Sequence, residues 1–443
     1  MKLWEKGCAS DTQTGEFTAG SDREMDLLLA PFDVAGSLAH IKMLHKINLL
    51  SADEHDSLKR ELLSIYETIE KGSFEIETDV EDVHSQIEIL LTRRLGDTGK
   101  KIHTGRSRND QVALDIKLFI RAKIEETVNK TVDLFRLLTN LSEKHKDFII
   151  PGYTHTQPAM PSSLGLLMGS YAESLTEDMF ALRYAFTLAN LNPLGSGAGY
   201  GSSFPLDREM TTRLLGFDDL NYNVLNAQSG RVKTEHSAAF ALSAVASTLV
   251  RMSNDICFYI SNNIISFPEE LTTGSSIMPH KKNPDALEII RAKCNQLQAI
   301  PYECSLVANN LISGYHRDFQ VIKETLLPAF EKLNSCMEIS IKMLQNIKPE
   351  KDIYKLENNE LFFSVEEVNK QVLKGAAFRD AYRSVASQIR EGKFAPSRQI
   401  RHTHQGSIGN LCNDKVAERM NGIVDTFPFE KVNKALKQLL ARG

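Results

Sequence analysis

The stretch richest in potential chemistry is the polar segment 274–284, which reads GSSIMPHKKNP. Its glycine, two serines, two prolines, two lysines and asparagine cannot form a regular helix, and this composition is typical of a functional loop. Asp285 and Glu288 follow, three apart, at the start of an apolar helical pattern over 287–297. Backbone N–H groups and lysine ammonium groups therefore converge on a place that should attract an anion. The alternative is an exposed hinge followed by an ordinary capping box. The loop alone does not distinguish this hinge from an anion-binding site.

Three further polar clusters interrupt the helical pattern. They are segments 104–110 (TGRSRND), 152–158 (GYTHTQP) and 315–323 (YHRDFQVIK), each at or near a break between helical runs. Gln320 and Lys323 are three apart, so on a helix they share one face. A solvated polar face is the commoner fate of such a pair, and a lone histidine such as His155 is more often structural than catalytic.

The elements that must position these clusters are helices. Apolar residues recur at helical spacing almost everywhere, and alternating strand patterns are hard to find. Asn109 or Asp110 is placed to cap a long helix that continues from Gln111, and Ser51 precedes another helix. Small residues among larger apolar ones in two long segments favour close helix packing. We predict an all-α protein with helical segments at 34–45, 58–69, 111–124, 162–190 and 234–265.

Chain length sets the domain organisation. A chain of 443 residues exceeds the size of one ordinary core. A proline-containing polar stretch over 347–352 marks a boundary. We predict three helical domains, with an N-terminal domain at 1–108, a central bundle of long helices carrying the loop at 109–350, and a C-terminal domain at 351–443.

Composition excludes several classes of function. With 25% charged residues and a formal net charge of -5, the chain has no basic footprint for nucleic acid. Six cysteines are scattered without C-x-x-C spacing, which favours a reducing cytoplasm. The N-terminal MKLWEKG has no apolar run behind it, and the longest uncharged helical run, 236–250, is too short to span a bilayer. We expect a cytoplasmic protein without nucleic-acid or membrane partners.

Taken in order, the polar segments resemble the fumarase/aspartase superfamily, whose hallmark is the loop 274–284. Segment 104–110 resembles the argininosuccinate lyase family in particular. The resemblance runs from about Leu3 to HTHQGSIGNL at 402–411, and it includes EDVH at 81–84 and PLGSGAGYGSSFPLDR at 193–208. It implies the L-aspartase-like helical fold, no metal or organic cofactor, and a homotetramer whose active sites are each shared by three subunits.

The resemblance also implies a reaction, the reversible β-elimination of argininosuccinate to arginine and fumarate in arginine biosynthesis. A base must take a proton from the carbon next to a carboxylate. Hydrogen-bond donors must then meet the doubly charged aci-carboxylate, and an acid must protonate the departing guanidino nitrogen.

Catalytic roles carry over by position in the motifs. Ser275 matches the serine base, which is plausible only if loop amides and Lys281 stabilise its alkoxide after the loop closes. Lys281 and Asn283 match residues that bind the substrate carboxylate and stabilise the aci-carboxylate. His155 matches a histidine once assigned the acid or base role, and Glu288 matches the carboxylate said to raise its basicity. A turn serine and a capping glutamate are the structural alternatives for Ser275 and Glu288.

Substrate-binding roles carry over in the same way, because three carboxylates and a guanidino group require fixed cations and donors. Ser21 is the nearest candidate for the family's N-terminal substrate serine, although a small insertion blurs the register between Phe17 and Asp33. Arg231 lacks the flanking aspartates of many family members. The predicted substrate-binding residues are Asn109, Thr154, Tyr315, Gln320, Lys323, Asn283, Arg108, Ser107, Ser21 and Arg231.

Two alternatives remain open. The first is another fumarate-releasing lyase of the superfamily, acting on adenylosuccinate, aspartate or malate. Such an enzyme would keep the same base with a different leaving-group pocket, so its substrate would distinguish it from an argininosuccinate lyase. A non-catalytic structural protein resembling the lens crystallins is the other. Intact Ser275, His155, Lys281 and Asn283 argue against it.

Overall fold

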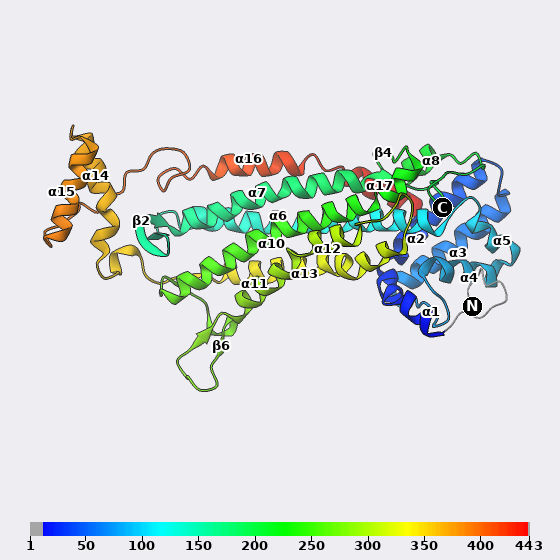
Figure 1. Ribbon diagram of the computed structural model, residues 1–443, viewed down its shortest axis with the longest axis horizontal. Helices are drawn as coiled ribbons and strands as arrows, with labels where there is room; N and C mark the ends of the chain where they lie inside the picture. The colour runs from blue at the N-terminus through cyan, green and yellow to red at the C-terminus, as the bar shows by residue number, and fades with distance from the viewer. Residues whose placement is uncertain (1–11, 442–443) are drawn as a thin grey trace.

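The computed structural model describes residues 12–441, an elongated and mostly helical molecule (Figure 1). Leu3, where the family resemblance begins, and Cys8, one of the six cysteines, lie outside the described residues. Long helices run side by side along the molecule, and the helices that precede α6 gather at one end. The predicted all-α bundle is confirmed.

The N-terminal helices pack into a core of their own. Ser51 is the N-cap of α3, as its position predicted. It also forms a capping box, because it accepts from the Glu54 N–H at 3.3 Å while Glu54 accepts from the Ser51 N–H at 2.9 Å. Buried residues of α2, α3 and α4 meet the first turns of α6 in this core. The elements are α1 (Thr12–Ala19), α2 (Asp22–Lys46), α3 (Ala52–Glu70), α4 (Val83–Leu95), α5 (Asp97–Lys100) and η1 (Lys101–His103).

The central bundle holds the largest apolar core. Helix α6 packs against α7 and α13, and α10 packs against α7, α11 and α12. A Cβ atom on Gly165 would lie 2.4 Å from the Ser142 carbonyl oxygen, so glycine is required where the start of α7 meets the end of α6. The helices are α6 (Arg108–Lys144), α7 (Leu164–Ala189), α8 (Arg208–Leu214), α9 (Val224–Ser229), α10 (Arg231–Ser261), α11 (Asp285–Leu297), α12 (Ile300–Val307) and α13 (Val321–Gln345), with η2 (Glu269–Leu271) and η3 (Arg317–Gln320) between them.

Within residues 12–441, four two-stranded sheets, which the sequence pattern did not predict, connect the helices. The longest is the antiparallel hairpin of β1 and β2, where Thr154 pairs with Gln157 across a two-residue turn. His155 and Thr156 form that turn with φ of +53° and +58°, as a type I′ turn requires. The strands are β1 (Ile149–Thr154), β2 (Gln157–Ser163), β3 (Leu191–Asn192), β4 (Asp219–Leu220), β5 (Ile265–Ser266), β6 (Thr273–Gly274), β7 (Lys282–Asn283) and β8 (Lys348–Pro349).

The C-terminal segment has two parts. Helices α14 and α15 lie at the end of the molecule opposite the N-terminal helices. Helix α16 runs back along α7, and α17 contacts α2 and α8 (Figure 1). The three-domain division therefore stays a prediction. The elements are η4 (Ile353–Lys355), η5 (Asn359–Phe363), α14 (Ser364–Leu373), α15 (Phe378–Arg390), α16 (Asn413–Val424) and α17 (Phe429–Leu439).

Among the described residues, α2 alone is long and apolar enough to cross a membrane when judged by length and composition. Of its apolar window, 72% is buried inside the molecule, as in a core helix, so this is weak evidence for a membrane span.

Candidate active site

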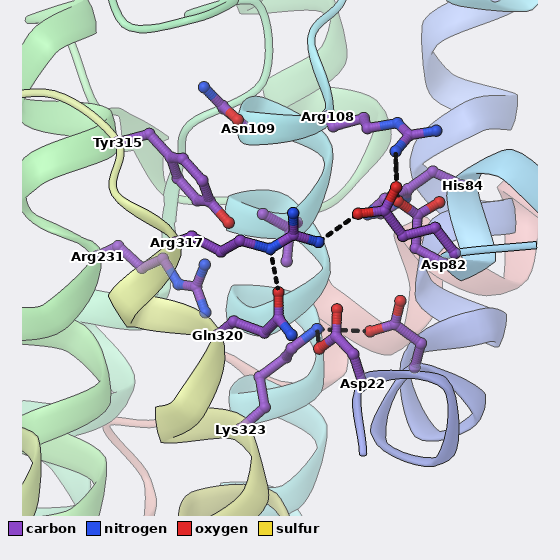
Figure 2. Close-up of a pocket in the computed structure, with 13 residues that line it drawn as sticks. Asp22, Asp82, His84, Arg108, Asn109, Arg231, Tyr315, Arg317, Gln320 and Lys323 are labelled. Carbon is purple, nitrogen blue, oxygen red and sulfur yellow. Dashed lines mark hydrogen bonds and ion pairs between the residues drawn. The ribbon is translucent and has the colours of Figure 1, made fainter. Parts of the chain in front are cut away.

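A polar pocket of about 210 Å³ lies where the N-terminal helices meet the start of α6 and the segment 315–323 (Figure 2). Figure 2 shows Tyr315, Arg231 and Gln320 on one side of the pocket and Asp22, Asp82 and His84 on the other. Six predicted substrate-binding residues line it: Arg108, Asn109, Arg231, Tyr315, Gln320 and Lys323.

The first turn of α6 is held by the hydrogen bonds of Ser107 and Asp110. Ser107 is its N-cap and forms a capping box with Asp110, so the cap predicted at Asn109 or Asp110 lies two or three residues too late. Buried Asp110 also accepts from the backbone N–H groups of Gly195 at 3.0 Å and Gly197 at 3.1 Å. Burial raises the pKa of Asp110 to about 6, although these hydrogen bonds oppose the rise. The helix entrance that presents Asn109 is therefore anchored to the glycine-rich segment 193–208.

Arg108 points away from its helix into an acidic corner. Its guanidinium lies 2.8 Å from an Asp82 carboxylate oxygen and 3.6 Å from one of Glu81, and it also donates to Ser85. Glu81 in addition pairs with Arg317. The segment EDVH thus supplies the counter-charges for two pocket arginines.

Arg231 is buried at the start of α10 and presents a free donor. It pairs with Glu235 at 3.0 Å and donates to the Phe319 carbonyl oxygen at 3.1 Å. Its Nη1 atom is buried and finds no hydrogen-bond partner among the described residues. Glu235, one turn along α10, supplies the acidic support that the residues flanking Arg231 lack, and the unpartnered nitrogen suits a substrate carboxylate.

The end of α1 and the start of α2 pair with Gln320 and Lys323, respectively. Buried Lys323 pairs with Asp26 at 2.7 Å and with Asp22, and Gln320 donates to the Thr18 carbonyl oxygen at 2.9 Å. Burial raises the pKa of Asp22 to about 6, although Lys323 opposes the rise. A substrate carboxylate that binds Lys323 must therefore compete with these two acidic side chains.

Two predicted substrate serines do not line the pocket. Ser107 caps α6 through its contact with the Asn109 N–H at 3.3 Å. Ser21 stands just before α2, and its neighbour Asp22 lines the pocket in its place. Because α2 starts at Asp22, the side chain of Asp22, and not that of Ser21, points toward Lys323. The insertion before Asp33 had concealed this register.

His84 joins the pocket to a buried ion-pair network. Its Nδ1 atom contacts Asp33 and lies 3.7 Å from an Asp115 carboxylate oxygen. Burial lowers the pKa of His84, but Asp33, Asp82 and Asp115 together raise it to about 9. Asp33, His84 and Asp115 also have the atom spacing of a metal site, and a metal ion bound there would have to displace the imidazole proton that the three carboxylates stabilise.

Thr154 and His155 lie elsewhere, on the exposed tip of the β1–β2 hairpin. The hairpin is at the opposite end of the molecule from α1 and α4 (Figure 1). Within one chain, these two residues are not brought to the pocket.

The loop between β6 and β7 carries Ser275 and Lys281 and projects from the bundle, and Asn283 is the last residue of β7 (Figure 1). The Ser275 hydroxyl oxygen accepts from the backbone N–H groups of Met278 at 3.1 Å and Ile277 at 3.4 Å. Two amide donors directed at one oxygen stabilise negative charge there. The loop amides that the serine base requires are therefore present.

Glu288 lies on the exposed face of α11, directly after this loop. The capping box of Asp285 and Glu288, which was the structural alternative for this segment, is absent. Helix α11 already begins at Asp285, and its N-cap Pro284 has no side chain that could accept a hydrogen bond. Thr273 instead donates to Asp285 and ties β6 to the helix.

Several pocket residues escaped the sequence analysis. Glu81, Asp82 and His84 lay within the quoted EDVH motif, and Arg317 lay within the segment 315–323. Asp22 and Asp26 are four apart on α2 and could have been found as a helical acidic pair. What the sequence lacked was a sign that these acids face Lys323, Arg108 and Arg317.

Comparison with known proteins assigns this chain to a class of enzymes. Residues 6–299 match a family model described as Lyase. An EDDS lyase variant with bound fumarate has a TM-score of 0.78 at 19% identity, covering 98% of this chain and 94% of that chain. Class II fumarase from Schistosoma mansoni has a TM-score of 0.71 at 16% identity, covering 96% and 94%. The protein is thus a lyase with the helical fold of these enzymes.

Relatives with similar sequences show the family within this class of lyases. Argininosuccinate lyase of Parabacteroides distasonis is 53% identical over 442 residues, covering 99% of each chain. Argininosuccinate lyase of Phocaeicola vulgatus is 54% identical over 444 residues, covering 100% of each. The chain belongs to the argininosuccinate lyase family.

Proposed function

We propose that this protein cleaves argininosuccinate to arginine and fumarate. The observation that carries the proposal is the pocket of Asn109, Tyr315, Gln320 and Lys323, four predicted substrate-binding residues from two distant segments, in a chain whose relatives bear that activity in their names. Its cations suit the substrate carboxylates, and its acidic residues suit the ammonium and guanidino groups.

In the elimination, Ser275 removes the proton from the carbon beside a succinyl carboxylate. The Ile277 and Met278 amides stabilise the serine alkoxide. Lys281 and Asn283 meet the aci-carboxylate, and His155, supported by Glu288, serves in proton transfer as the guanidino nitrogen departs. No metal or organic cofactor enters this scheme.

The complete site requires more than one chain. Pocket, hairpin and loop lie apart within the subunit, which supports a homotetramer whose sites each combine segments of three subunits (Figure 1). Phe180 and Tyr184 on α7 and Phe240 on α10 are exposed on the central helices, as burial between subunits would explain. The five cysteines among the described residues are free, which fits work in a reducing cytoplasm.

The direct test is to incubate the purified protein with argininosuccinate and to follow fumarate by its ultraviolet absorbance. Malate, aspartate and adenylosuccinate are run in parallel, with Ser275→Ala as the control. We expect fumarate from argininosuccinate alone, and its release to be strongly slowed in the variant. Activity on another of these substrates would overturn the specificity, and inactivity of a well-folded tetramer on all four would favour a structural role.

A further inference from the structure

A second groove lies at the opposite end of the molecule from the pocket of Figure 2. This α14 groove has a volume of about 690 Å³ and is lined by α14, the segment 397–404 and Met160 of β2. It shares no lining residue with the pocket of Asn109 and Lys323. Small-molecule sites in proteins have volumes of about 300–1,000 Å³, so the groove is large enough for a ligand of metabolite size.

The lining of the α14 groove is positively charged. Lys370, Lys374 and Arg401 line it, and Glu366 is the one carboxylate among its lining residues. Lys370 pairs with Glu367, which lies outside the lining, at 3.3 Å. Among residues 12–441, neither Lys374 nor Arg401 forms an ion pair. With three cations against two carboxylates, the groove keeps a net positive charge before its two histidines are counted.

The wall that faces α14 is a compact loop, the HTHQGSIGNL segment at 402–411, which the proposed function leaves without a role. A Cβ atom on Gly409 would lie 1.9 Å from the His402 carbonyl oxygen, so only glycine allows the loop to close on itself. The Ser407 hydroxyl donates to a backbone carbonyl oxygen of the same loop at 2.6 Å. His402 Nε2 lies 2.9 Å from a Glu366 carboxylate oxygen and ties the loop to α14. The groove is therefore formed before any ligand binds.

The remaining lining residues indicate the kind of ligand. Leu373 on α14 is 88% exposed, and Met160 is partly buried on the side of β2, so both offer apolar surface to a carbon skeleton. Neutral groups that can form hydrogen bonds complete the lining: Asn369, Ser397, Gln399 and Thr403. Cations beside apolar and neutral polar surface suit an organic anion better than a bare inorganic ion.

We propose that the α14 groove binds a small organic anion that carries two or more negative charges. Its charged groups bind Lys374 and Arg401, since a guanidinium presents paired N–H donors to phosphate and carboxylate groups alike. Its carbon skeleton lies against Leu373 and Met160. Because Met160 belongs to β2, which follows the turn that carries His155, the bound anion also stabilises the β1–β2 hairpin.

The first test measures anion binding to the assembled wild-type protein by isothermal titration calorimetry at constant ionic strength, which keeps charge screening equal in every run. The probes are phenyl phosphate, citrate and inorganic phosphate. We expect phenyl phosphate or citrate to bind saturably and inorganic phosphate to bind about tenfold more weakly, because it has no carbon skeleton to bury. The tighter of the two organic probes identifies phosphate or carboxylate as the preferred charged group. No saturable binding of either, or equal affinity for inorganic phosphate, would overturn the proposal.

Paired variants locate the bound anion. The double variant Lys374→Gln, Arg401→Gln removes two groove cations and should weaken binding by about tenfold or more. The matched control Arg390→Gln, Lys393→Gln removes the same charge from exposed residues outside the lining and should keep the affinity of wild type. Equal weakening in both would mean that only the overall charge matters. Loss of binding in Lys323→Met instead would place the anion in the pocket of Figure 2, and either result would refute the assignment.

Hydrogen exchange tests the effect on the hairpin. Saturating phenyl phosphate should slow the exchange of backbone amides in 149–163 and 397–411 in wild type, and not in the double variant Lys374→Gln, Arg401→Gln. Protection of 397–411 without 149–163 would contradict the effect on the hairpin, and protection of neither would contradict the site itself. All of these measurements follow binding alone, so their outcome is independent of the proposed elimination.

Discussion

At the scale of single residues, Ser275 carries the proposed proton abstraction. Replacing it with alanine removes the base but leaves the two loop amides and the pocket unchanged. We expect Ser275→Ala to lower kcat by roughly 10²–10⁴-fold with a small change in KM. Steady-state fumarate release measures both.

Ser276→Ala is the matched control, because Ser276 is the neighbouring loop serine and is exposed. It should keep most of the activity. Equal losses in the two variants would mean that the loop's conformation, and not the Ser275 hydroxyl, limits the reaction.

His84 provides a test of the ion-pair network behind the pocket. Its folded-state pKa of about 9 lies above the ordinary value of 6.5, so its charge stabilises the fold fully below about pH 6.5 and ceases to do so as the pH rises through 9. Such a rise corresponds to roughly 3 kcal/mol at most, since each pKa unit is about 1.4 kcal/mol.

His84→Gln should therefore destabilise the protein by up to that amount near pH 6 and by much less near pH 10. Urea unfolding midpoints of wild type and variant at the two pH values check the difference. A stability gap that does not change with pH would show that His84 acts through packing alone.

At the scale of elements, the contact between α6 and α7 depends on Gly165. An added Cβ would lie 2.4 Å from the Ser142 carbonyl oxygen, a rigid backbone atom. We expect Gly165→Ala to cost roughly 1–3 kcal/mol and to lower activity, because α7 continues directly from the hairpin that carries His155.

Thermal unfolding and the fumarate assay measure the two effects. Gly422→Ala on α16 is the control, since nothing lies within 4 Å of its added Cβ, and it should leave stability unchanged or slightly higher. Similar behaviour of both variants would contradict the requirement for close approach at Gly165.

At the scale of the whole molecule, the shared site predicts complementation between inactive variants. Lys323→Met damages the pocket and Ser275→Ala damages the loop, and the proposed tetramer draws these two segments from different subunits. Random mixing of equal amounts should therefore assemble intact sites in about a quarter of the positions.

The experiment is co-denaturation and refolding of the two variants, with each variant refolded alone for comparison. We expect the mixture to regain about a quarter of wild-type activity. No gain from mixed tetramers would place both segments of one site on the same subunit.

Much of this protein was determined by its sequence alone. Helical periodicity predicted the long bundle, because an apolar face repeating every three or four residues can be buried only by another helix. Ser51 was recognised as a helix start from its position in the sequence, and the polar segments that broke the pattern contained Asn109, Tyr315, Gln320 and Lys323.

Only the tertiary structure decided which residues face one another. The β1–β2 hairpin was missed because its prolines and glycine obscure an alternating pattern, and its pairing is set by a turn of two residues with positive φ. Asp22 replaced Ser21 at the pocket because the start of α2 sets the direction of each side chain. The pair of Lys323 with Asp26 joins positions far apart in the sequence, and such a contact arises only when helices pack.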